Sequence, residues 1–108
     1  MKSFIALTIL LLSHHSFASA CLNHSDQESQ RAEINKLISE SKYCEIDSDC
    51  KLASLGCPFG CVTAINAANV QLVVSAANAY HDQSCTQCMY KCGHASKAEC
   101  ENQKCTVK

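Results

Sequence analysis

The sequence contains no tryptophan, one proline and three glycines, and aromatic residues make up 6% of its 108 positions. Protein-binding faces are enriched in large aromatic side chains, so no aromatic-rich binding face is visible here. The chain also lacks a serine nucleophile elbow, an H-E-x-x-H run and the spacing of a catalytic carboxylate pair. These absences predict that the protein is not an enzyme.

Positive charge is not concentrated in any part of the chain. After Lys2 there are eight Lys or Arg residues against ten Asp or Glu residues, and residues 52–81 contain none of these four types. Nucleic acids and anionic membrane surfaces attract proteins through clusters of basic side chains. We therefore expect no nucleic-acid partner, and the expected partner is another protein.

The longest hydrophobic run stands at the N-terminus and is too short to cross a bilayer. Residues 4–12 are nine apolar or nearly apolar positions, whereas a transmembrane helix needs about 20. The run follows Lys2 and leads to Ala18-Ser19-Ala20, which is the pattern of a secretory signal peptide with its cleavage site. We predict that residues 1–20 are removed and that residues 21–108 form a single domain without a transmembrane segment.

Ten cysteines follow the predicted cleavage site. An even number at this density in a small exported chain indicates a disulfide framework. Each bridge adds about 2–4 kcal/mol to a domain whose hydrophobic core is small. We predict five disulfides, no metal site, no cofactor, and a secreted or periplasmic location. The residues are Cys21, Cys44, Cys50, Cys57, Cys61, Cys85, Cys88, Cys92, Cys100 and Cys105.

Cys21 would be the first residue after cleavage, which is the position that bacterial lipoproteins modify. Ala18-Ser19-Ala20-Cys21 matches a lipobox at the two positions before the cysteine but lacks the leucine usual at the third. Lipidation would also leave nine thiols, an odd number. A lipid anchor through Cys21 is therefore the alternative to a free exported domain.

Two segments have helical periodicity. In residues 26–42 the apolar stripe includes Ile34 and Ile38, and Ser25 with Glu28 has the pattern of a capping box.

In residues 66–82 the stripe includes Val73, Ala77 and Tyr80, and Asn66 is a favourable N-cap.

Short strands are expected around these helices. Residues 51–55 and 88–92 are compatible with strands, and residues 98–100 and 104–107 with the two arms of a hairpin around Asn102-Gln103. The predicted fold is small, disulfide-rich α+β, with two helices and a few short antiparallel strands.

Two alternative uses of the cysteines are disfavoured by their positions. Cys85-x-x-Cys88 follows the end of a predicted helix, whereas a thiol-disulfide oxidoreductase places its first cysteine at a helix N-terminus. Cys57 and Cys61 could join this pair as zinc ligands, but about sixteen helical residues separate the two pairs by roughly 24 Å.

The same distance makes a positive prediction. If the chain runs back extended after the second helix, about ten residues at 3.3 Å each cover the length of the helix. We therefore predict that Cys92 bonds to Cys57 or Cys61. The full connectivity stays open, because ten cysteines allow roughly 900 pairings.

The loop of residues 57–61 is the candidate recognition site. Two bridged ends and Pro58 would hold it rigid, and an exposed Phe59 could enter a partner's pocket at low entropic cost. The alternative is that Phe59 turns inward as one of the few large core residues.

The cysteines stand in a characteristic arrangement: Tyr43-Cys44-x-x-Asp47-Ser48-Asp49-Cys50, then Gly56-Cys57-Pro58-Phe59-Gly60-Cys61, then Cys100-x4-Cys105. It resembles small exported cysteine-rich bacterial proteins of uncharacterised function. The resemblance implies compartment and type of fold, and no functional residues. We expect an exported, non-enzymatic binding or inhibitory module, with a structural or envelope-associated protein as the alternative.

Overall fold

The computed structural model describes residues 21–85, 88–95 and 97–108, so the predicted signal peptide lies outside the described residues. The order of elements is α1 (His24–Glu40), a 3-10 turn η1 (Asp47–Asp49), β1 (Cys50–Ala53), β2 (Thr63–Asn66), a second 3-10 turn η2 (Ala67–Asn69), α2 (Val70–Ser84), β3 (Ala98–Glu101) and β4 (Lys104–Val107). Two helices and two antiparallel hairpins confirm the predicted small, disulfide-rich α+β fold.

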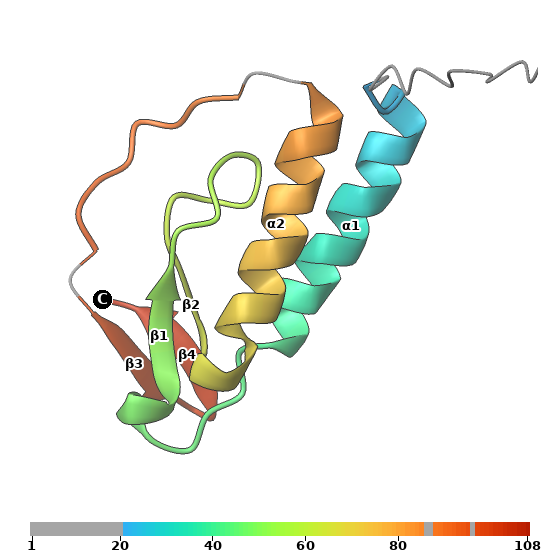
Figure 1. Ribbon diagram of the computed structural model, residues 1–108. Helices are drawn as coiled ribbons and strands as arrows, with labels where there is room; N and C mark the ends of the chain where they lie inside the picture. The colour runs from blue at the N-terminus through green and yellow to red at the C-terminus, as the bar shows by residue number, and fades with distance from the viewer. Residues whose placement is uncertain (1–20, 86–87, 96) are drawn as a thin grey trace, which may run out of the picture.

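The two helices lie side by side and run in opposite directions, and both hairpins gather near the end of α1 and the start of α2 (Figure 1). Residues 88–95 run along the outside of the molecule, apart from the helices and hairpins (Figure 1). Within the described residues, no helix has the length and apolar character needed to cross a membrane.

Helix α1 begins two residues earlier than its sequence pattern predicts. Asn23 is the N-cap, and its side-chain oxygen accepts a hydrogen bond from Asp26 N at 2.8 Å. The predicted capping box of Ser25 and Glu28 is therefore wrong, because Asn23 already supplies the acceptor that this end of the helix needs.

Helix α2 buries the stripe that the sequence indicated. Val73, Ala77 and Tyr80 are buried against the core. The helix itself is Val70–Ser84, because Asn66 caps the preceding η2 turn by accepting a hydrogen bond from Ala68 N at 2.9 Å. The predicted N-cap thus acts one element earlier than expected.

Asn66 joins three segments and gives a first testable prediction. Its Nδ2 donates to Tyr43 O at 2.8 Å while its Oδ1 accepts from Ala68 N. Asn66→Ala removes both bonds and should lower the free energy of unfolding by about 1–2 kcal/mol in urea denaturation. Asn66→Asp keeps the acceptor and should lose about half as much. Equal losses in the two variants would contradict this assignment.

The hairpin of β3 and β4 matches the predicted arms. Its register pairs Cys100 with Cys105. Asn102 and Gln103 both have positive φ, 51° and 61°, which is the requirement of a two-residue type I′ turn.

The other hairpin was only half predicted. β1 pairs with β2 from Cys50↔Asn66 to Ala53↔Thr63. No strand was predicted at residues 63–66, and Asn66 was expected only as a helix N-cap. The predicted strand at residues 88–92 is wrong, because none of these residues pairs with a strand among the described residues.

Two buried clusters hold these elements together. The first joins both helices to β1, β2 and the loop between them: Ile34, Ile38, Ala53, Leu55, Phe59, Ile65, Val73, Ala77 and Tyr80. The second lies between the hairpins and consists of Cys44, Cys50, Ala64 and Cys105. The helices therefore pack through apolar side chains, whereas disulfide bonds hold the two hairpins together.

Candidate functional site

All ten cysteines are paired at disulfide distance. The pairs are Cys21–Cys85, Cys44–Cys100, Cys50–Cys105, Cys57–Cys88 and Cys61–Cys92. The last pair confirms the prediction that Cys92 returns to the loop of residues 57–61. Many disulfides fit an extracellular or otherwise oxidising compartment.

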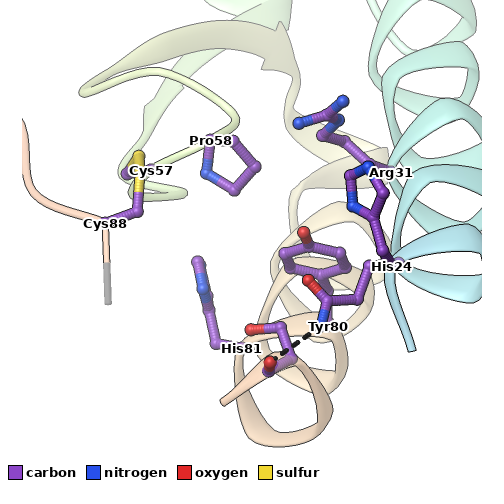
Figure 2. A pocket seen from close by; sticks show the side chains of 9 residues that line it. His24, Arg31, Cys57, Pro58, Tyr80, His81 and Cys88 are labelled. Atoms are coloured by element: carbon purple, nitrogen blue, oxygen red, sulfur yellow. Dashed lines mark hydrogen bonds between the residues drawn. A yellow bond between two sulfur atoms is a disulfide. The ribbon is translucent and has the colours of Figure 1, made fainter. Parts of the chain in front are cut away.

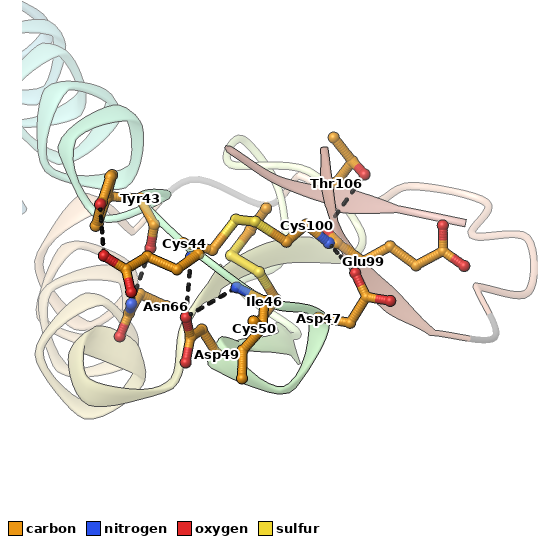
Figure 3. The surroundings of a disulfide bond; sticks show 12 residues. Tyr43, Cys44, Ile46, Asp47, Asp49, Cys50, Asn66, Glu99, Cys100 and Thr106 are labelled. Carbon is orange, nitrogen blue, oxygen red and sulfur yellow. Dashed lines mark hydrogen bonds between the residues drawn. A yellow bond between two sulfur atoms is a disulfide. The ribbon is translucent and has the colours of Figure 1, made fainter. Parts of the chain in front are cut away.

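Two of the bridges form the structural cluster between the hairpins. Cys44–Cys100 and Cys50–Cys105 pack against each other, and the Sγ atoms of Cys44, Cys50 and Cys105 lie within 4.8 Å of one another. Figure 3 shows Cys44, Cys50 and Cys100 in this cluster. Asp47 Oδ1 accepts from Cys100 N at 2.7 Å, which ties η1 to β3. Cross-linking of the hairpins therefore accounts for the four cysteines of these two bridges.

The pKa values of Lys42 and Tyr43, which lie next to this cluster, are shifted. The pKa of Lys42 is lowered by burial and, to a smaller extent, by the charge of Lys104. Tyr43 donates to Glu45 Oε1 at 3.1 Å, and this hydrogen bond and the carboxylate charge raise the pKa of its hydroxyl. Both shifts therefore concern groups beside the disulfide cluster, whose role is structural.

No disulfide joins the two cysteines of the C-x-x-C motif. Cys85 bonds to Cys21 and Cys88 bonds to Cys57, whereas a thiol-disulfide oxidoreductase forms the bond within its motif. Together with Cys61–Cys92, these pairs occupy the four sulfurs of the zinc alternative. The Sγ of Cys21, which a lipid thioether would require, is likewise bonded.

The structure separates the two residues of the candidate recognition loop. Phe59 is only 8% exposed and packs edge-on against Tyr80, with ring centroids 5.1 Å apart. The expectation of an exposed Phe59 is wrong, and the core alternative holds. The ring turns inward because Gly56 and Gly60, with φ of 76° and 98°, allow the tight loop around it. Pro58 remains partly exposed.

The exposed side chains lie in residues 88–92, which two disulfides join to this loop. We name residues 88–92 the clamped segment, because Cys88 and Cys92 at its ends bond to Cys57 and Cys61, with Cα–Cα distances of 5.5 and 5.6 Å. Between them Met89 is 91% exposed and Tyr90 49% exposed. Lys91 is exposed as well.

The backbone of the clamped segment is unpaired within the described part of the chain. None of its N–H or C=O groups takes part in a backbone hydrogen bond with another described residue. The segment runs outside the body of the molecule, between the end of α2 and the start of β3 (Figure 1). Sequence reasoning missed it as a site because its residue types favour a strand.

A pocket of about 210 Å³ lies beside the Cys57–Cys88 bridge. Helix α1 contributes His24 and Arg31, helix α2 contributes Tyr80 and His81, and Pro58 comes from the loop (Figure 2). These residues are far apart in the sequence, and the antiparallel packing of the two helices brings them together.

Most polar groups around the pocket have partners in the protein. His81 Nε2 lies 2.8 Å from Leu55 O, a contact that the N–H tautomer makes as a donor. Glu28 Oε1 lies 3.4 Å from His24 Nε2 and 3.9 Å from an Arg31 guanidinium nitrogen.

The hydroxyl of Tyr80 is the exception. Tyr80 is 7% exposed, and its hydroxyl makes no hydrogen bond to another described residue. Among the described residues no buried side-chain oxygen lacks a partner, so this hydroxyl is the part of Tyr80 that reaches solvent. Figure 2 shows its ring standing among the lining side chains.

Comparison of this chain with family models, with curated proteins and with solved structures returned no match.

Proposed function

We propose that this chain is an exported, non-catalytic inhibitory module, secreted or periplasmic, whose clamped segment occupies the substrate cleft of an endopeptidase. The observation that carries the proposal is the combination found at residues 88–92. Three consecutive exposed side chains stand on an unpaired backbone that disulfides hold at both ends.

The unpaired backbone supports this type of partner. An extended peptide binds a protein cleft by adding a strand, so that main-chain hydrogen bonds supply affinity and side-chain pockets supply specificity. In the clamped segment no N–H or C=O group makes a backbone–backbone hydrogen bond with another described residue, and Tyr90 O has only a 4.0 Å contact with Cys92 Sγ inside the segment. These groups can therefore bind in a cleft without loss of any backbone hydrogen bond of the fold.

The two bridges favour inhibition of the endopeptidase over release of this protein as a cleaved substrate. Ordering a free peptide on binding costs conformational entropy, and a segment tied at both ends has lost much of that freedom beforehand. If the peptide bond after Tyr90 or Lys91 were cut, both new ends would stay bonded through Cys88 and Cys92. The products would then remain in place instead of diffusing away.

The exposed side chains identify the endopeptidases to test. Lys91 suits a specificity pocket with an acidic base, as in trypsin, and Tyr90 suits an apolar slot, as in chymotrypsin. Neither side chain has a structural role that a substitution would disturb, because both are exposed.

Inhibition of trypsin and chymotrypsin by the oxidised protein tests the proposal. We expect an inhibition constant below about 1 µM for at least one of them. Lys91→Ala should weaken trypsin inhibition, or Tyr90→Ala chymotrypsin inhibition, by about 100-fold. Lys36→Ala and Leu72→Ala, at exposed positions on α1 and α2, are the matched controls and should change nothing. Absence of inhibition of both enzymes at about 10 µM, or equal effects in segment and control variants, would contradict the proposal.

A second arm tests the role of the clamp. Removing the Cys61–Cys92 bridge with paired serine substitutions frees one end of the segment while Cys57–Cys88 still holds the other. We expect this variant to be cleaved as a substrate by the enzyme that the parent protein inhibits, with a peptide bond after Tyr90 or Lys91 broken in the mass spectrum. An uncut variant that inhibits as well as the parent would show that the clamp has no such role.

A further inference from the structure

We propose that the pocket beside the Cys57–Cys88 bridge is a separate binding site for a carboxylate group, with the Tyr80 hydroxyl and the Arg31 guanidinium as donors. This site does not depend on the inhibitory function, because Cys88 is the one residue of the clamped segment that lines it and the exposed residues 89–91 do not.

The first argument is the unpartnered hydroxyl of Tyr80. The side chain is buried apart from this hydroxyl, which lies among residues that line the pocket and is available to donate a hydrogen bond to a ligand there. The ring alone explains the packing, since it meets Phe59 edge-on at 5.1 Å and His81 at 6.0 Å. A phenylalanine would make the same contacts, so packing leaves the hydroxyl unexplained. An oxygen of a ligand in the pocket can accept this hydrogen bond in place of water.

The second argument is the charge at the rim. Arg31 meets Glu28 through one nitrogen at 3.9 Å, which is longer than a hydrogen bond. A guanidinium has five N–H donors in a planar fork that matches the two oxygens of a carboxylate. His24 stands on the same helix and also lines the pocket. Glu28 is shared between His24 and Arg31, so it does not occupy all the donors of either.

The third argument is size and apolar lining, which limit the rest of the ligand. The volume of about 210 Å³ exceeds the roughly 150 Å³ of a cavity that accepts benzene. Pro58, the Cys57–Cys88 bridge and the face of Tyr80 give apolar walls. The site therefore suits a carboxylate joined to one ring or a short aliphatic chain. A free small acid and the C-terminal carboxylate of a peptide share this chemistry.

Titration of the oxidised protein with 3-phenylpropanoate, followed by ¹⁵N–¹H NMR, tests the site. We expect saturable shifts with a Kd between about 10 µM and 1 mM, and about tenfold weaker binding of 3-phenylpropanamide, which lacks the charge. A peptide ending in phenylalanine, with a free or amidated C-terminus, is the second pair of probes. Binding of the free-acid peptide alone assigns the site to protein C-termini, and binding of both acids assigns it to carboxylates in general.

Tyr80→Phe and Arg31→Gln should each weaken binding of the acid by about tenfold. Tyr80→Phe keeps the ring contacts and should leave the unfolding transition nearly unchanged, so a loss of binding cannot be a loss of fold. Lys36→Gln, an exposed cation on the same helix, is the matched control and should bind like the parent. No saturable binding at about 10 mM, equal affinity for acid and amide, or full binding by Tyr80→Phe would overturn the proposal.

Discussion

Replacing Cys50 and Cys105 together with alanine should lower the free energy of unfolding by about 4 kcal/mol. With Cys44–Cys100 still in place, this bridge closes a ring through residues 44–50 and 100–105, and opening that ring costs about 3 kcal/mol. Both sulfurs also lie in the buried cluster between the hairpins, so their removal leaves a void there. The loss is a large part of the total stability of a domain this small.

Urea denaturation followed by circular dichroism measures this effect, and removal of the Cys61–Cys92 bridge is the comparison. With Cys57–Cys88 still in place, that second bridge closes only a small ring, so its loss should cost about 2–3 kcal/mol. Cys92 is exposed, so no buried void is added. Equal costs for the two bridges, or a greater cost for the outer one, would contradict the division into a structural cluster and a clamp.

Phe59→Ala should lower the free energy of unfolding by about 3–5 kcal/mol, the cost of removing a buried aromatic ring. Phe59 is the aromatic residue of the loop that fills the core between α2 and β1, where it contacts Tyr80 and His81. Phe59→Leu retains part of the volume and should cost about 1–2 kcal/mol.

The matched control for Phe59 is Leu72→Ala. Leu72 is 58% exposed on α2, and its removal should change stability by less than about 0.5 kcal/mol. Thermal and urea unfolding of the three variants checks this order. A loss below about 1 kcal/mol for Phe59→Ala, together with weakened endopeptidase inhibition, would return the ring to the surface as a contact residue.

The sequence predicted the helices well, because helical periodicity is a local property. Ile34 and Ile38 repeat at the spacing that one buried face requires, as do Val73, Ala77 and Tyr80. The helix ends were harder to predict, because they depend on which side chain accepts a hydrogen bond from a free N–H of the first turn. At α1 that side chain is Asn23 and not Ser25.

The strands were harder to predict, because a strand exists only where a partner strand lies beside it. Residues 88–92 have strand-like composition, but β3 pairs with β4 and leaves them no partner among the described residues. β2 was missed for the opposite reason. Its four residues are too few to stand out, and the pairing with β1 defines them.

The candidate site depends on long-range contacts that the sequence does not display. Helix length alone predicted that Cys92 returns to the 57–61 loop, and the structure confirms this. Which of Pro58 and Phe59 faces outward was decided by the tertiary packing against Tyr80. The pocket needs Arg31 and Tyr80, 49 positions apart in the numbering, and only the packing of α1 on α2 joins them.

The central claim is that Cys57–Cys88 and Cys61–Cys92 hold residues 88–92 at both ends. Mass spectrometry of non-reduced peptic peptides from the oxidised protein tests it most directly. The account predicts a cluster in which the 57–61 peptide stays joined to the 88–92 peptide by two bridges, with Cys85 joined separately to Cys21. Local bridges, such as Cys57–Cys61, Cys88–Cys92 or Cys85–Cys88, would leave the segment unclamped and would contradict the account.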